Sequence, residues 1–154
     1  MRHFCCSLVV TLSLGAGLMA TGESLAPIDF AKAAVSRALD YEQGNRASLV
    51  DAQDDFTPEA WSEFMKWLQE YVDDKGAPTG SSLFTATGEV VVKSEQAGVF
   101  RVAIDGTLKQ QSRNAYGGTL AATYRVTVDI ELTGHPPKII HLKTTTCGAK
   151  PCAR

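Results

Sequence analysis

Asp54–Val72, DDFTPEAWSEFMKWLQEYV, carries the strongest helix-start signal in the sequence, and the rest of the fold follows from it. Thr57 can cap the first turn through its hydroxyl, and Pro58 suits the first helical position. Phe56 before the cap and Trp61 in the helix have the spacing of a hydrophobic staple, which fixes how the chain enters the helix. An apolar face follows at helical spacing: Trp61, Phe64, Leu68, Tyr71 and Val72. The pattern predicts an amphipathic helix, ending near Asp74, that needs an apolar partner surface.

The second half of the chain supplies that surface, because its apolar residues repeat every second position. This period predicts four strands, Leu83–Lys93, Gly98–Lys109, Thr119–Leu132 and Lys138–Thr146. The third alternates most strictly and places one row on a single face: Leu120, Ala122, Tyr124, Val126, Val128, Ile130 and Leu132. Turn-like connections separate the strands, with Gln110–Gly118 between the second and third. Strands joined this tightly are expected to be antiparallel neighbours.

The elements before the strands are helical. Asp29–Gln43 and Arg46–Gln53 have apolar residues at helical spacing and precede the capped helix. A four-stranded sheet with one apolar face can hide that face by curling around these helices. The predicted fold class is therefore α+β, with two to three N-terminal helices packed into a curved four-stranded antiparallel sheet.

Length and charge limit the domain count and the partners. The chain has 154 residues and a formal net charge of −2, from 15 basic and 17 acidic side chains. One domain over residues 28–146 accounts for this length. The charge balance lacks the basic footprint of a nucleic-acid-binding protein, so no nucleic-acid partner is expected.

The N-terminus is typical of an exported protein. Residues 4–20, FCCSLVVTLSLGAGLMA, contain no charge and follow a short, weakly basic start. With small residues around Ala20 and Gly22, residues 1–22 are predicted to be a secretory signal peptide. The alternative is an uncleaved membrane anchor, because this run lies at the lower limit for crossing a bilayer, about 17 residues. A membrane is expected as a partner only if the segment is retained.

Export changes how the cysteines are interpreted. After cleavage Cys147 and Cys152 remain, in the tail 147–154. In an oxidising compartment two close cysteines around a Gly/Pro turn most simply form a disulfide. A redox site is the alternative, but the spacing is C-x4-C and not the C-x-x-C of thioredoxin-like sites.

The strand pattern argues against acid–base catalysis. By parity, Asp105, Asp129, Glu131 and His141 all fall on the polar face of the sheet. The inward positions are aliphatic or aromatic, and Tyr124, the one with a polar tip, is interpreted as a core residue. We therefore predict no catalytic residue, no cofactor and no metal. The predicted core anchors are Phe56, Trp61, Phe64, Leu68 and Tyr124.

A partner surface is predicted on the polar face. Its outward row includes Thr123, Arg125, Thr127 and Asp129, with mixed charge and several threonines. Such a row is typical of a solvated sheet face, and it also suits a contact with another subunit. Arg113 and Tyr116, in the Gln110–Gly118 connection, are exposed candidates for the same contact.

Two motifs resemble a known family. Asp40-Tyr41 and the run FTPEAWSEF at Phe56–Phe64, with Leu68 behind it, resemble the pattern of the IcmL/DotI family. These are inner-membrane components of type IV secretion systems whose periplasmic domain is similar to the VirB-type channel subunit. The resemblance covers about residues 28–146 and implies a nuclear-transport-factor-2-like (cystatin-like) cone, with helices packed in a curved antiparallel sheet.

The sequence and the resemblance together favour a non-enzymatic scaffold or assembly protein of the periplasm that acts by protein–protein contact. Expected partners are secretion-complex subunits or further copies of the chain. The alternative location is the inner membrane, through a retained anchor. The alternative function is a periplasmic small-molecule binder or SnoaL-like enzyme that uses the cavity of the cone.

Overall fold

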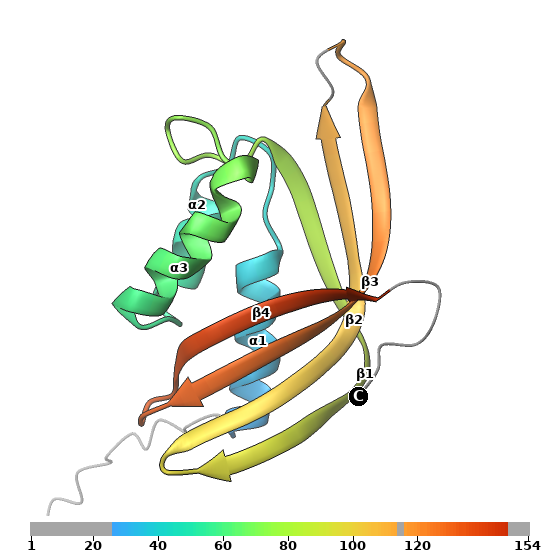
Figure 1. The fold of residues 1–154 in the computed structure, drawn as a ribbon. Coiled ribbons are helices and arrows are strands. Elements are labelled where there is room, and N and C mark those ends of the chain that lie inside the picture. Colours follow the sequence, from blue (N-terminus) through green and yellow to red (C-terminus); the bar gives the residue numbers. More distant parts are fainter. Residues whose placement is uncertain (1–25, 114–115, 148–154) are drawn as a thin grey trace, which may run out of the picture.

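The computed structural model describes residues 26–113 and 116–147 (Figure 1). The elements are α1 (Pro27–Leu39), α2 (Ala47–Gln53), α3 (Pro58–Leu68), the short 3-10 helix η1 (Gln69–Tyr71), β1 (Gly80–Gln96), β2 (Val99–Arg113), β3 (Thr119–Thr133) and β4 (Lys138–Cys147). The predicted signal peptide, residues 1–22, and Cys152 lie outside the described residues. Within the described ranges, no helix has the length and apolar character needed to cross a membrane.

Helix α3 begins as its sequence predicts. The Thr57 hydroxyl accepts the Ala60 N–H at 3.4 Å, and Pro58 is the first helical residue. The rings of Phe56 and Trp61 meet edge to face with their centroids 5.4 Å apart, which forms the staple. The backbone on either side of Phe56 pairs with Ile139 of β4, so the start of α3 is fixed to the sheet.

The end of α3 differs from the prediction. The helix stops at Leu68 and tightens into η1, several residues before the expected end near Asp74. The Asp73 carboxylate accepts the backbone N–H groups of Lys75 and Ala77, both at 2.9 Å. A short acidic side chain that bonds nearby N–H groups stabilises a turn at the expense of a continued helix.

The four strands form one antiparallel sheet in the order β1-β2-β3-β4, as predicted. Strands β1 and β2 are longer than expected, because residues 80–82 pair with residues 110–112. Those residues are serines, glutamines and glycine, which give no apolar alternation to recognise. Arg113 is therefore the last residue of β2 and not part of a loop.

The sheet bends where β1 crosses the middle of β2. A Cβ at Gly106 would lie 2.4 Å from ring carbon Cε2 of Phe84 and 2.7 Å from the carbonyl oxygen of Thr85. Only glycine allows this close approach. The β1–β2 register also shifts between Ala86 and Val90. Below the bend the sheet curves around α1, and above it the β2–β3 hairpin extends beyond the helices (Figure 1).

The core fills the space between the helices and the lower part of the sheet. Three alanines of α1, Ala31, Ala34 and Ala38, are fully buried and let this helix lie close to the strands. The remaining buried side chains are almost all aliphatic or aromatic. They include three predicted anchors, Phe56, Phe64 and Leu68, while Trp61 is partly buried against the same cluster.

The inward row of β3 is buried over only half its length. Val126, Val128, Ile130 and Leu132 are buried, as the alternation predicts. Leu120 is 59% exposed and Tyr124 is 40% exposed, so Tyr124 is not the core residue that the pattern indicated. Both lie on the hairpin above the bend, where none of the described helices covers the sheet (Figure 1).

Candidate protein-interaction surface

The polar face of the sheet is crossed by side-chain contacts over its lower half. Lys93 forms an ion pair with Asp129 at 2.5 Å, and Arg101 forms one with Glu131 at 2.9 Å. The Thr127 hydroxyl donates to the Asp105 carboxylate at 2.6 Å. Two residues of the predicted partner surface, Thr127 and Asp129, therefore have partners within the chain. These contacts are half-exposed, and such ion pairs contribute little to stability, about 0–1 kcal/mol each.

The other predicted partner residues gather at the end of the β2–β3 hairpin. Arg113 pairs with Thr119 across the two strands, and Thr123 and Arg125 follow along β3, all exposed. Tyr116, in the connection, is 97% exposed. We call this part of the sheet, residues 109–113 and 116–125, the hairpin end. Its inner face adds Leu120 and Tyr124, so it presents cationic, polar and apolar side chains together.

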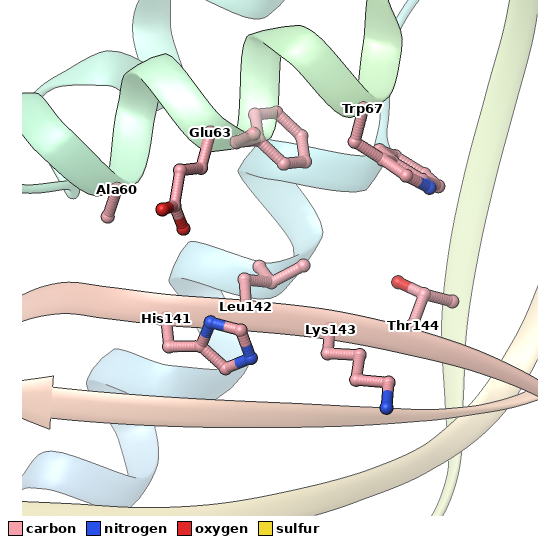
Figure 2. Close-up of a pocket in the computed structure, with 8 residues that line it drawn as sticks. Ala60, Glu63, Trp67, His141, Leu142, Lys143 and Thr144 are labelled. Atoms are coloured by element: carbon pink, nitrogen blue, oxygen red, sulfur yellow. The ribbon is translucent and has the colours of Figure 1, made fainter.

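A groove that the sequence did not predict runs between α3 and β4 (Figure 2). It has a volume of about 350 Å³. Its walls are Ala60, Glu63, Phe64 and Trp67 from the helix and His141, Leu142, Lys143 and Thr144 from the strand. The two walls are distant in the sequence and carry no shared motif. The one hint of a groove in the sequence is Trp67, a large aromatic residue that lies off the apolar face of the predicted helix.

The groove combines aromatic and polar groups. The rings of Phe64 and Trp67 lie tilted to each other with their centroids 5.8 Å apart, and the rings of Trp67 and Tyr71 lie tilted with their centroids 6.1 Å apart. Trp67 is 45% exposed. Figure 2 shows the Glu63 carboxylate pointing from α3 toward the strand that carries His141. The Thr144 hydroxyl oxygen is shielded from solvent and has no hydrogen-bond partner in the described part of the chain. These groups can bind a polar, partly apolar ligand, but they do not form a nucleophile–base pair.

Two titratable residues between α1 and β1 are held in structural contacts. The Asp40 carboxylate accepts the Phe84 N–H at 2.5 Å, and the Tyr41 backbone pairs with that of Ser82 in both directions. Burial raises the pKa of both the Asp40 carboxyl and the Tyr41 phenol. In the sequence, Asp40 and Tyr41 stand out only as part of the family motif. Their contacts show that they join the end of α1 to the sheet.

The fold is shared with solved structures of secretion proteins. An IcmL-like type IV secretion system protein from Legionella pneumophila matches 82% of this chain and 94% of its own, with 13% identity and a TM-score of 0.58. The chain has the fold of type IV secretion subunits. CagV, a VirB8 homologue from Helicobacter pylori, matches 80% of this chain and all of its own, with 13% identity and a TM-score of 0.55. The periplasmic domain of DotI matches 78% and 93%, with 16% identity and a TM-score of 0.54.

These structures confirm the predicted α+β, nuclear-transport-factor-2-like fold and the predicted resemblance to IcmL and DotI at the level of fold. No protein-family model matches the sequence, and neither does any curated protein. The similarity therefore lies in the arrangement of helices and strands.

Proposed function

We propose that this chain is a non-enzymatic scaffold or assembly subunit of a type IV secretion complex, located in the periplasm. The observation that supports this function most is the apolar interior of the cone. Among the residues buried in the described part of the chain, the polar or charged ones are Asp55 and Ser82, and the large buried side chains are hydrophobic, Tyr41 included. Asp55 pairs with Arg37 through two hydrogen bonds of 2.6 and 3.0 Å. Within the described residues, this interior offers almost none of the polar groups that orient a ligand or a substrate in a pocket.

The proposed contacts use the hairpin end. Its exposed side chains, Arg113, Tyr116, Thr123 and Arg125, include the residue types that anchor protein interfaces, tyrosine and arginine. The lower polar face is the weaker candidate, because Thr127 and Asp129 already have partners within the chain. The partners would be other secretion subunits, in line with the type IV secretion system named for two of the similar structures, or further copies of this chain.

Site-specific crosslinking in cells tests this function. A photoreactive residue at Tyr116 or Thr123 is expected to capture other subunits, whereas one at Lys32, an exposed position on α1, serves as the matched control. Mass spectrometry identifies what is captured. Equal capture at Lys32 and at the hairpin end would contradict the proposed contact surface. Loss of secretion in Tyr116→Ala with Arg125→Glu, at unchanged protein level, would support it.

The proposed location follows from the predicted signal peptide, and the proposed Cys147–Cys152 disulfide would form in such an oxidising compartment. Cell fractionation and N-terminal sequencing test it. A periplasmic protein that begins near residue 21 is expected. An intact Met1 in the membrane fraction would instead support the inner-membrane alternative, in which residues 4–20 act as an anchor.

The groove between α3 and β4 favours a second candidate function, the binding of a small molecule. Its volume of about 350 Å³ is at the lower end for ligand sites. Trp67 and the unpartnered hydroxyl of Thr144 could bind an apolar and a polar part of one ligand. Native mass spectrometry of the purified protein tests this. A bound mass that Trp67→Ala removes and that Leu83→Ala retains would support the binder, because Leu83 is an exposed residue that does not line the groove.

A further inference from the structure

One segment of the sheet has an open edge. Strand β3 pairs with β2 from Thr133 to Thr119, but β4 follows it only as far as the pair Arg125 and Cys147. From Thr119 to Tyr124, β3 therefore has a neighbour on one side and none of the described strands on the other. The hairpin extends away from the helices here, so no described helix covers this edge (Figure 1).

The other edges of the sheet carry features that prevent strand pairing. Along β1, Tyr41 bridges to Ser82, the register shifts twice, and Glu89, Lys93 and Glu95 place charges on the strand. Along β4, the chain at residues 55–57 bonds to Ile139 from outside, and His141 and Lys143 follow. Charges, bulges and covering segments of this kind are how proteins protect exposed edges.

Among the described residues, the β3 edge has none of these features. Its sequence is TLAATY, without a charge, a proline or a register shift, and Leu120 and Tyr124 are exposed beside it. An uncharged edge with exposed apolar side chains is a template for another strand. An edge left unprotected while two others are protected indicates that its pairing is used.

We propose that a second copy of this chain pairs with Thr119–Thr123 as an antiparallel strand, around a two-fold axis at Ala121. This inference rests on the proposed scaffold function and names one contact of the hairpin end. A two-fold axis perpendicular to the sheet keeps the same face of both copies on the same side. Two residues can then lie opposite each other only if both side chains belong to the same face of β3. With Ala121 on the axis, Leu120 faces Ala122 and Thr119 faces Thr123, and no charges oppose each other.

The position of β4 fixes the axis. If Ala122 lay on the axis, Thr119 would face Arg125 of the other copy, a position that Cys147 already fills. With Ala121 on the axis, pairing runs from Thr119 to Thr123 and Tyr124 faces Gly118, so Arg125 keeps its partner Cys147 at the end of β4. This register therefore matches like faces over most of the open segment and leaves the β3–β4 pairing intact. A strand pair of this length buries a small area, so the dimer is expected to be weak and dependent on concentration.

Disulfide trapping in the full chain tests the register. Every variant carries Cys5→Ser and Cys6→Ser, and one new thiol is added. On the axis, two copies of Ala121→Cys lie about 4.5–5.5 Å apart between Cα atoms, within the range that a disulfide spans. Two copies of Ala122→Cys, the matched control, are offset by two residues and lie about 8 Å apart, beyond that range. We expect about tenfold more covalent dimer from Ala121→Cys under mild oxidation.

A charge at the same position provides the second measurement. Ala121→Lys places two lysines against each other on the axis, and we expect sedimentation equilibrium to show dimerisation weakened by about tenfold or more. Because Ala121 is exposed, the monomer keeps its fold. Thr85→Lys, at an exposed position of β1, is the control and is expected to leave the dimer unchanged.

Three results would overturn the inference. The first is equal trapping from the two cysteine variants, and the second is an unchanged dimer in Ala121→Lys. The third is trapping that appears only after residues 148–154 are deleted, which would mean that the tail of the same chain covers the edge. The proposed function is judged separately. If Tyr116 still crosslinks to other subunits while no dimer forms, the scaffold function stands and the self-pairing does not.

Discussion

Replacing Phe64 with alanine is expected to be among the most destabilising single changes in α3. Phe64 is 5% exposed and has three aromatic neighbours, Phe56 at 5.2 Å, Trp61 at 5.6 Å and Trp67 at 5.8 Å between centroids. Burial of about 150 Å² of apolar surface at about 25 cal/mol per Å² gives about 4 kcal/mol. This agrees with the range of about 3–5 kcal/mol measured when buried aromatic residues become alanine.

Urea unfolding measures this loss, and Trp67→Ala is the matched control three residues along the same helix. Trp67 is 45% exposed, so its removal is expected to lower the free energy of unfolding by about 1 kcal/mol. The dependence on urea concentration should stay unchanged in both variants if each only destabilises the native state. A loss below about 1.5 kcal/mol for Phe64→Ala, or equal losses for both variants, would refute the packing described here.

Three further predictions concern the cap, one carboxyl group and the tail. Thr57→Ala is expected to cost about 1 kcal/mol in the same unfolding assay, because the Ala60 N–H loses its acceptor, while Thr57→Ser keeps most of the stability. The raised pKa of Asp40 means that the folded protein binds this proton more tightly than the unfolded chain does. The free energy of unfolding should therefore fall as the pH rises from 3.8 through the raised pKa, and Asp40→Asn, which keeps an acceptor for the Phe84 N–H, should flatten this fall. Without reductant, iodoacetamide is expected to leave the peptide with Cys147 and Cys152 unmodified in protein taken from the periplasm, and two modified thiols would contradict the disulfide.

The start of α3 and the order of the strands could be predicted from the sequence because their signals are local. The Thr57 cap and the Phe56–Trp61 staple depend on residues within one or two turns of each other. Alternation along β3 likewise depends only on neighbours in the chain. Such features need no knowledge of the tertiary structure.

The depth of the core could not be predicted, since it depends on how far the helices reach across the sheet. Leu120 and Tyr124 continue the same alternation as Val126 and Val128, yet they lie beyond the helices and are exposed. The groove could not be predicted for a related reason. Its two walls, with Trp67 on α3 and Thr144 on β4, meet only after the chain has folded.

The two parts of the sheet on either side of the bend at Gly106 are expected to exchange their backbone amide hydrogens with solvent at different rates. Below Gly106, the strands are covered by core side chains, so their amides should exchange only when the whole domain unfolds. Above it, the amides of the hairpin end can exchange through local opening that leaves the core intact. Substitutions of the exposed side chains of the hairpin end therefore carry little folding cost. The proposed contact surface and the folding core therefore lie on separate segments of the same two strands, so each can vary in evolution without the other.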